Sequence, residues 1–478
     1  MALSKYKQEQ KKISKMNIGV IHSQVGFDDG VSIVMEQVEE VMSKNLNIPK
    51  SNIFYLVGKS KKSLKRITEK EVLWHKNSTN SLLNFHYNKG FGGALSEKIE
   101  QSIGLAKEAI KEFVYGKKID ILIVHNSSHP VNFVSSVAIS RFYRDEINLG
   151  KKPPRYILWW HDSHLERERY KNPSRDIKNY LLEGVPGKYV NYIVYINRLQ
   201  FENSQKYLKE LDSRSPGFYK KLIKNHTVIY NTATTYINKF SDLHKEEYSL
   251  GVERFLKDYK IKEIIEKNKI SLKDIQFCLQ HTRIVKRKRI DFALEYCYEI
   301  FERLKSEKMS KAFVFLVSGP SGDEAGDYKK ELIELNKKLR KDYNTDKFFL
   351  IFSEDKKSDI SFEDIPPLIA RLGGFSTYFS EVEGFGNNLL EVFASGLIPV
   401  LYAYPVYLKE LSEHNFRAVE LNKFEIFPES IEKLLNYLKD DDSKRNAANY
   451  NIKTLKKEFS HRTIAPKLRR AIIRDLEK

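Results

Sequence analysis

Residues 380–400 read SEVEGFGNNLLEVFASGLIPV, a stretch that joins the end of a predicted strand to the start of a predicted helix. Gly384 and Gly386 stand in the turn between them, where the absence of a Cβ lets the backbone approach a ligand closely. The free amide groups of the first helical turn then offer a site for a phosphate. Glu383 lies in the turn and Glu391 about two helical turns further on, so their carboxylates can reach the hydroxyl groups at two ends of one bound ligand.

Short apolar runs alternate with amphipathic segments on both sides of this stretch. Continuous apolar runs of this kind indicate strands of a parallel sheet that is covered on both faces. A polar stretch at residues 232–253 divides the runs into two groups, which predicts an α/β protein with two open sheets facing each other across a cleft. The predicted strands are residues 17–21, 119–126, 156–162, 191–197, 226–231, 275–283, 312–319, 348–353, 375–380 and 398–403.

The composition of the 478-residue chain excludes several classes of protein. With 41% hydrophobic and 30% charged residues, it is not a disordered or low-complexity chain. Its two cysteines, Cys278 and Cys297, cannot form a disulfide framework. The longest apolar runs fall far short of the about 20 residues that a membrane span needs, and the first 17 residues lack the apolar segment of a secretory signal. We therefore expect a soluble, cytoplasmic protein.

The charge balance points to an anionic partner. The chain has 82 basic and 63 acidic residues, a formal net charge of +19. Such an excess suits a nucleic acid, an anionic membrane surface or a phosphorylated substrate, while a solvated lysine-rich surface is the alternative. There is no zinc-finger spacing, no aromatic RNA-binding motif and no basic region followed by heptads, so we do not expect nucleic-acid binding.

The opening stretch carries a family resemblance. Its pattern E-G-F-G-N-x-L-L-E, followed by A-S-G-x-x-P-V, resembles the E-x7-E signature of retaining glycosyltransferases of the GT-B fold, family 4 in particular. The resemblance extends over residues 17–455 and is dense in the second half. It implies an N-terminal Rossmann-like acceptor lobe at residues 17–240 and a C-terminal Rossmann-like nucleotide-sugar donor lobe at 241–455. We expect residues 1–16 to be a disordered basic tail and residues 456–478 a helix that could pack back on the first lobe.

The resemblance also assigns candidate catalytic residues. Arg283 and Lys288 match an R-x4-K element that holds the donor diphosphate, where two fixed cations stabilise the charge of the leaving group. Glu383 would hold hydroxyl groups of the donor sugar, and Glu391 the ribose diol. His161, at the end of the predicted strand YILWWHD, would contact the donor sugar from the first lobe.

Three glycine-containing turns supply the remaining donor-site candidates. The segment HSQVGFDDGVS at residues 22–32 occupies the place of the family's first glycine loop, which often carries a Gly-Gly pair. Here Gly26 and Gly30 are separated, and we favour Gly30 because it stands at the helix start. Lys286, Arg287 and Arg289 are predicted to be surface charges or acceptor contacts. The candidate donor-binding residues besides Glu391 are Gly30, Gly319, Gly384, Phe385, Gly386, Asn387, Asn388 and Leu389.

The implied activity is transfer of a hexose from a nucleoside-diphosphate sugar, with retention, to a small polar or lipid-linked acceptor. We expect no metal and no cofactor, because protein cations take the place of a metal at the diphosphate. The D-x-D string at residues 440–442 lies in a solvated charge run, so it does not predict a metal site.

Three alternatives stay open. The protein could be a membrane-peripheral transferase acting on a lipid-linked acceptor. It could run another GT-B reaction, such as a phosphorylase or a sugar-nucleotide epimerase. It could also be a non-catalytic protein that binds carbohydrate or nucleic acid.

Overall fold

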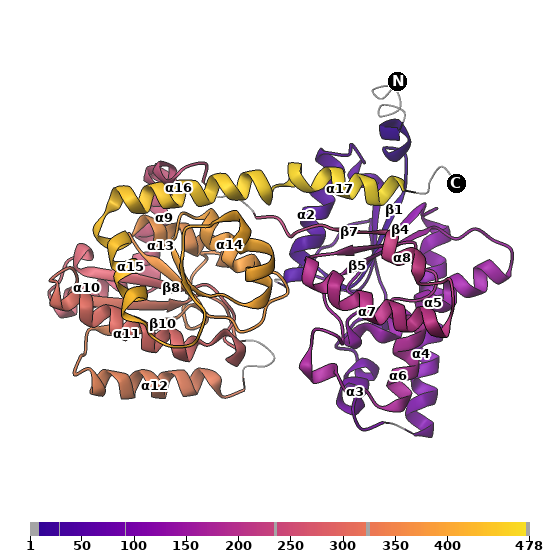
Figure 1. Ribbon diagram of the computed structural model, residues 1–478, viewed down its shortest axis with the longest axis horizontal. Coiled ribbons are helices and arrows are strands. Elements are labelled where there is room, and N and C mark those ends of the chain that lie inside the picture. Colours follow the sequence, from indigo (N-terminus) through magenta and orange to yellow (C-terminus); the bar gives the residue numbers. More distant parts are fainter. Residues whose placement is uncertain (1–8, 28, 91, 234–236, 322–325, 475–478) are drawn as a thin grey trace. The chain divides into compact units, whose positions relative to one another are not determined.

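Two parallel β-sheets, built from separate parts of the chain, form the framework of the protein (Figure 1). The computed structural model describes residues 9–27, 29–90, 92–233, 237–321 and 326–474. One unit comprises Met1–Thr232 with His461–Lys478, and the other comprises Ala233–Ser460.

The first sheet has seven strands in the order β3-β2-β1-β4-β5-β6-β7, and every neighbouring pair is parallel. The strands are β1 Ile18–Val25, β2 Ile53–Ser60, β3 Ile67–Glu69, β4 Ile121–His125, β5 Arg155–Trp160, β6 Tyr192–Tyr195 and β7 His226–Val228. The helices of this unit are α2 Gly30–Lys44, α3 Ser78–His86, α4 Gly93–Gly116, α5 Phe133–Asn148, α6 Arg175–Gly184, α7 Arg198–Arg214, α8 Lys220–Lys224 and α17 His461–Ile473.

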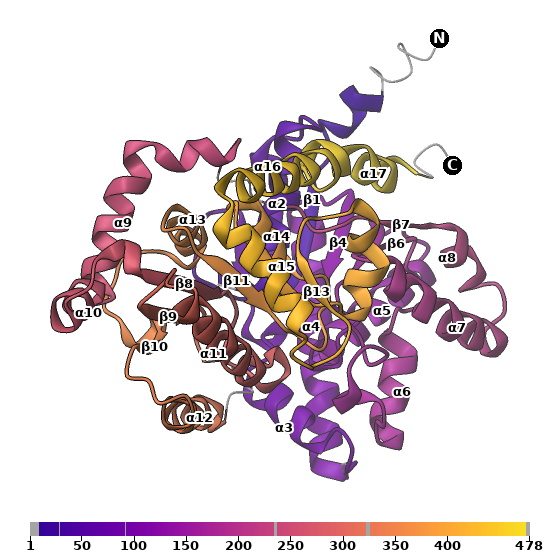
Figure 2. The ribbon, with the colours of Figure 1, turned by 60° about the vertical axis from the view of Figure 1, so that its left-hand side comes forward.

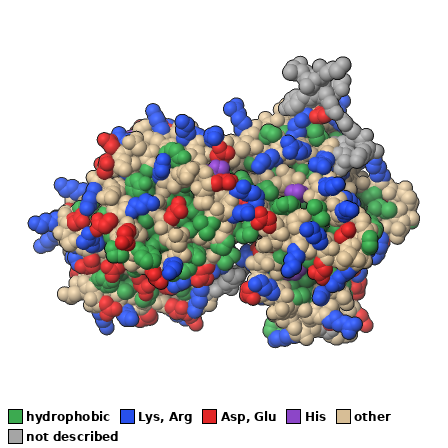
Figure 3. Space-filling view, viewed as in Figure 1, with side chains coloured by type: hydrophobic (Ala, Val, Ile, Leu, Met, Phe, Trp, Pro, Cys, Tyr) green, Lys and Arg blue, Asp and Glu red, His purple; other side chains and the backbone are tan. Residues whose placement is uncertain are grey.

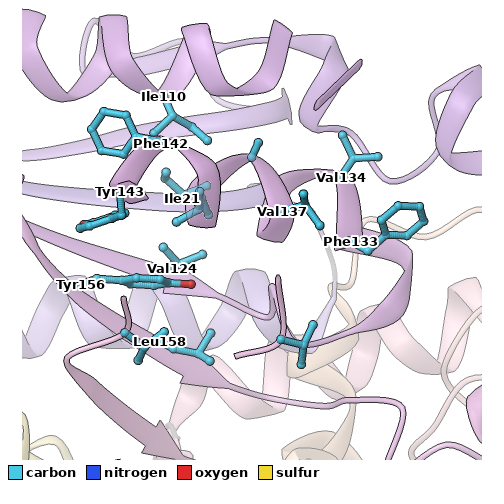
Figure 4. Packing of buried hydrophobic residues seen from close by; sticks show 14 of the residues in the cluster. Ile21, Ile110, Val124, Phe133, Val134, Val137, Phe142, Tyr143, Tyr156 and Leu158 are labelled. Atoms are coloured by element: carbon cyan, nitrogen blue, oxygen red, sulfur yellow. The ribbon is translucent and has the colours of Figure 1, made fainter. Parts of the chain in front are cut away.

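Helices α4 and α5 bury one face of the first sheet (Figure 4). Ile110 of α4 and Phe142 of α5 pack in the same cluster as Ile21, Val124 and Leu158, which come from three adjacent strands. Each such side chain contributes about 1.5–3 kcal/mol when it is fully removed from water. This burial is what the continuous apolar runs of the strands predict.

The second sheet has six parallel strands in the order β10-β9-β8-β11-β12-β13. The strands are β8 Ile275–Gln280, β9 Ala312–Val317, β10 Phe348–Phe352, β11 Phe375–Tyr378, β12 Pro399–Tyr402 and β13 Val419–Leu421. The helices are α9 Glu246–Asp258, α10 Ile261–Asn268, α11 Ile290–Ser306, α12 Tyr328–Asp342, α13 Ile365–Arg371, α14 Asn387–Ala394, α15 Pro428–Lys439 and α16 Asp441–Glu458.

Helices cover both faces of the second sheet (Figure 2). Cys278 of β8 belongs to the cluster with α11, whereas its neighbours Phe277 and Leu279 belong to the cluster with α13. Successive side chains of a strand point to opposite faces, so a strand buried on both faces must be apolar at every position. The prediction of an α/β protein with two Rossmann-like parallel-sheet lobes is confirmed.

The strand order of the second sheet reverses between β8 and β11. Numbered within this unit, the order is 3-2-1-4-5-6, the doubly wound arrangement in which ligands bind beyond the carboxyl ends of the strands at the reversal. Arg283, Lys288, Glu383 and Glu391 follow β8 or β11 in the chain, so the topology places the segments that carry them at this edge.

Both ends of the chain differ from simple tails. Residues 9–13 are helical and Ile13 is fully buried, so the predicted disordered tail is wrong for residues 9–16, while residues 1–8 lie outside the described part. Helix α17 packs on α2 and β7 of the first unit.

The charge run at residues 440–442 lies at the start of α16. The Asp440 carboxylate accepts hydrogen bonds there from the amides of Asp442 and Ser443, at 3.0 and 3.1 Å.

Lysine and arginine side chains are spread over both units on the face shown in Figure 3. None of the helices in the described ranges is long and apolar enough to cross a membrane.

Candidate active site

The loops after β8, β9 and β11 start from one edge of the second sheet. Gln280, the last residue of β8, lies opposite Thr377 of β11 and opposite Val317, the last residue of β9. Segments that are far apart in the sequence therefore begin side by side. This arrangement brings Lys288, from the loop after β8, against Glu383, from the loop after β11.

Lys288 and Glu383 form an ion pair, in which the Lys288 ammonium donates to Oε1 of Glu383. The side chains are only 7% and 11% exposed. The Tyr378 hydroxyl donates to the same oxygen at 2.7 Å, and Nη1 of Arg287 lies 3.7 Å from Oε2. Arg287 also donates to the Val382 carbonyl at 2.8 Å. Arg287 is half-buried and faces Glu383, so it is not a plain surface charge, whereas its contact with the acceptor stays a prediction.

The electrostatics keep both members of the pair charged at neutral pH. Burial would raise the pKa of Glu383, but Lys288 and Arg287 outweigh burial and lower this pKa to about 2. Burial lowers the pKa of Lys288 to about 8, against the attraction of Glu383 and with added repulsion from Arg287 and Arg283. Arg283 itself is exposed. Its charge is thus close enough to act on Lys288 while its side chain stays open to solvent.

Glu391, on α14, lies beside a buried histidine that the sequence analysis missed. Its Oε2 is 2.9 Å from Nε2 of His281, and Nδ1 of His281 is 2.8 Å from the Ser318 hydroxyl. His281 is fully buried, whereas the Glu391 side chain is 12% exposed. His281 and Ser318 directly follow the adjacent strands β8 and β9, and two polar residues at such positions were the available signal.

Gly386 precedes α14 and cannot be replaced without strain. Its φ is +106°, and a Cβ at this position would lie 2.1 Å from the Tyr404 hydroxyl oxygen. That hydroxyl donates to the Phe385 carbonyl at 2.9 Å. Tyr404, which lies two residues after the end of β12, therefore helps to hold the conformation of the turn before α14.

The other residues of this turn divide into packing and polar positions. Phe385 and Leu389 have buried side chains, so they pack in the interior and do not present side chains to a ligand. The Leu389 amide donates to the Gly386 carbonyl at 3.0 Å, so the prediction that this amide is open to a phosphate is wrong. Asn388 donates through Nδ2 to the His281 carbonyl at 3.0 Å, which ties α14 to the end of β8. Asn387 is half-buried and Gly384 is exposed.

Gly319 and Gly30 lie in two further turns. A Cβ on Gly319 would lie 2.4 Å from the Thr282 carbonyl oxygen, so only glycine allows the loops after β8 and β9 to pass this closely. Gly30 is the first residue of α2 and is exposed. The amides of Val31 and Ser32 donate to the Asp29 carboxylate at 3.0 Å each, so an internal carboxylate already occupies this helix start.

His161 lies at the carboxyl end of β5, in a group of histidines at the edge of the first sheet. Its Nε2 is 2.9 Å from Nδ1 of His125, and Nδ1 of His22 is 3.0 Å from the His125 carbonyl oxygen. Gln200 donates to the His161 carbonyl at 2.7 Å. Burial, with repulsion from His22 added, lowers the pKa of His161 to about 3, so the ring is neutral at physiological pH. The sequence analysis missed His22 and His125, although both stand on neighbouring strands.

Within the described ranges, no three His, Cys, Asp or Glu side chains come together in a way that could hold a metal ion. The absence of a metal requirement stays a prediction.

No family model matches the chain. A protein of Petrotoga mobilis named mannosylglucosylglycerate synthase is 30% identical, covering 85% of this chain and 86% of the relative. A protein of the same name from Thermotoga maritima is 24% identical, and the match covers 96% of this chain and 100% of the relative.

The fold is similar to several solved structures. A glycosyltransferase from Rickettsia africae superposes with a TM-score of 0.55 at 14% identity over 96% of this chain and 100% of that one. HepE of Anabaena, solved in complex with UDP, superposes with a TM-score of 0.54 at 13% identity, over 96% of this chain and 99% of that one. A UDP-forming α,α-trehalose-phosphate synthase from Burkholderia xenovorans superposes with a TM-score of 0.63 at 11% identity, over 97% of this chain and 100% of that one.

Two doubly wound parallel sheets, a charged turn at the strand reversal and these relatives together define a glycosyltransferase of the GT-B fold. More narrowly, the chain belongs to the mannosylglucosylglycerate synthase family, because the Petrotoga relative is 30% identical over most of both chains.

Proposed function

We propose that the protein is a retaining, metal-independent hexosyltransferase of family 4 that acts on a small acidic sugar acceptor. The observation that carries the proposal is the buried cluster of Lys288, Arg287 and Glu383 at the carboxyl ends of β8 and β11. The names of the two relatives suggest a mannosyl donor and glucosylglycerate as the acceptor. A glycerate carboxylate also suits a chain with a net charge of +19.

The cations of the cluster suit a diphosphate leaving group. Negative charge grows on the diphosphate as the bond to the anomeric carbon breaks, and fixed cations stabilise that charge in the transition state. Lys288 and the exposed Arg283 supply these cations, with Arg287 next to them. Their presence is the reason for proposing that no metal is required.

The two glutamates have separate roles in this proposal. Glu383 is ionised at neutral pH and accepts hydrogen bonds from hydroxyl groups of the donor sugar. Glu391 accepts from the ribose diol, while His281 holds one of its two oxygens in place.

Retention of configuration defines how the atoms move. The bond between the anomeric carbon and the diphosphate oxygen breaks, and the acceptor oxygen bonds to the same face of that carbon. The proton of the acceptor hydroxyl passes to the departing diphosphate. The neutral His161 ring contacts the sugar and takes no proton in this scheme.

The test is a transfer assay with the purified full-length chain. Glucosylglycerate is offered with a panel of nucleoside-diphosphate hexoses, with and without a chelator, and the anomeric configuration of the product is read by NMR. The proposal predicts an α-linked product from an α-configured donor such as a nucleoside-diphosphate α-mannose, at a rate that the chelator does not change. An inverted product or loss of activity with the chelator would contradict the mechanism.

The same assay separates the alternatives. A phosphorylase would need inorganic phosphate, and an epimerase would convert the donor without an acceptor. Transfer only to a lipid-linked acceptor in anionic vesicles would favour a membrane-peripheral transferase. Donor binding without turnover on any acceptor would indicate a non-catalytic protein.

A further inference from the structure

A second polar cluster lies in the first unit, on the loops after β4 and β5. It comprises His129 and Arg169, which both contact the buried ring of Tyr170, and Arg167, which pairs with Asp162 and whose charge acts on His129. The His129 and Tyr170 rings meet edge to face, with their centroids 5.3 Å apart. The Arg169 guanidinium carbon lies 5.5 Å from the centroid of the Tyr170 ring. The Tyr170 hydroxyl donates to Asn84 at 3.1 Å. The Tyr170 ring is therefore held by a hydrogen bond and contacts both His129 and Arg169.

The hydrogen bonds of His129 determine which nitrogen carries its proton. Nδ1 accepts from the Val131 amide at 3.2 Å, so the proton of the neutral ring is on Nε2. Burial lowers the pKa of His129 to about 4; Asp162 opposes this shift, and Arg167 and Arg169 add to it. The ring is thus neutral at physiological pH and presents Nε2–H as a hydrogen-bond donor among positive charges.

The cluster carries one positive charge that its own residues do not balance. Arg167 forms an ion pair with Asp162. Arg169 is exposed and makes no ion pair within the part of the chain that the structure describes. Glu168, between them in the sequence, pairs with Lys171. The Arg169 guanidinium is therefore available to pair with the carboxylate of a bound ligand.

The cluster is connected to the predicted sugar-contacting loop. Asp162 directly follows His161, and the Ser128 hydroxyl donates to the Asp162 carbonyl at 2.6 Å. This hydrogen bond joins the loop after β4, which carries His129, to the loop after β5, which carries the arginines. Both loops leave the same edge of the sheet as His161.

We propose that His129, Arg167 and Arg169 bind the carboxylate of an acidic acceptor and make the enzyme select it over neutral sugars. The inference rests on the proposed function, since it names the acceptor subsite of that reaction. A guanidinium group matches a carboxylate with two parallel hydrogen bonds, and the His129 Nε2–H supplies a third donor. A neutral acceptor would lack the charge-assisted hydrogen bonds to these groups and would therefore bind more weakly.

Calorimetry on the full-length protein tests the subsite separately from turnover. Glucosylglycerate is compared with glucosylglycerol, which has a hydroxymethyl group in place of the carboxylate. The wild type should bind the acid more tightly, and Arg169→Ala should weaken binding of the acid about tenfold to a hundredfold while leaving the neutral analogue unaffected. Arg169→Lys should fall between the two, because it keeps the charge but loses the paired geometry.

The matched control is Arg214→Ala, which removes an exposed arginine that pairs with Glu210 on α7. It should bind both compounds as the wild type does. Equal affinity of the wild type for the acid and the neutral analogue, or unchanged binding of the acid by Arg169→Ala, would overturn the inference. Tight, Arg169-dependent binding of the acid without transfer from any nucleotide sugar would support the subsite and overturn the proposed function instead.

Discussion

Lys288 and Glu383 stand 95 residues apart in the sequence and form a nearly buried ion pair in the second unit. The pair exists because β8 and β11 are neighbours in the sheet. Removing two charges from water is costly, and a structure retains such a pair only where hydrogen bonds and further charges compensate. Here Tyr378 and Arg287 supply that compensation on the Glu383 side.

Replacing Lys288 should damage both stability and turnover. Lys288→Met leaves the Glu383 carboxylate buried with less compensation, which should lower the free energy of unfolding by about 3 kcal/mol. It also removes a cation from the diphosphate, which should lower kcat about a hundredfold or more. Denaturant unfolding and initial-rate kinetics measure the two effects.

The double variant Lys288→Met/Glu383→Gln separates them. It removes the unpaired charge, so it should regain stability without regaining turnover. The surface control Lys286→Met breaks an exposed pair with Glu331 and should change either quantity little. A parental kcat in Lys288→Met would rule out the role of this cation.

Glu383 should make the protein sensitive to acid. Because the folded pKa is about 2 and the ordinary value is 4.5, the charged carboxylate contributes stability above pH 4.5 that is lost as pH falls towards 2. The contribution is on the order of 3 kcal/mol. The wild type should therefore exceed Glu383→Gln in free energy of unfolding at pH 7, and the difference should shrink towards pH 3. A difference that stays constant with pH would exclude this linkage.

Lys288 should make donor binding sensitive to base. Its pKa of about 8 means that the ammonium charge is lost above this pH. Calorimetric titration with a nucleoside diphosphate between pH 7 and 9.5 should show affinity falling above pH 8, by up to about tenfold per pH unit. Lys288→Met should bind more weakly at pH 7 and lack this decline. An identical decline in the variant would assign it to another group.

Gly386 should tolerate no side chain. Gly386→Ala places a Cβ against the Tyr404 hydroxyl at a positive φ, so the free energy of unfolding should fall by about 2 kcal/mol or more. Gly104→Ala is the control, because Gly104 lies within α4 with open space around it and should gain about 0.5–1 kcal/mol. Thermal unfolding of both variants measures the contrast. Equal stability of the two variants would contradict the close packing of this turn.

The sequence was informative where a pattern runs along one segment of chain. The helix start at Asn387 and the strands around it follow from apolar runs and glycines at fixed offsets, so residues 380–400 could be interpreted directly. Strand β2 was missed although its apolar residues, IFYLV, form the same kind of run. That omission was one of interpretation, since the physical signal was present.

Contacts between loops could not be predicted in the same way. In the run KRKR at residues 286–289, a tight turn sends Lys288 inward, tilts Arg287 towards Glu383 and leaves Lys286 exposed. No spacing rule decides which side chain of such a run turns inward. The pairing of Glu391 with His281 likewise depends on strand order, which joins residues 110 positions apart.

Binding of a nucleoside-diphosphate hexose to Arg283→Ala decides whether the carboxyl ends of β8 and β11 hold the donor. Arg283 is exposed, so its removal should leave the fold intact and report on ligand binding alone. We predict that calorimetry will find its affinity for the donor reduced about tenfold or more, whereas the nearby control Lys286→Ala binds as the wild type does. Wild-type affinity in both variants would contradict a donor diphosphate at this site.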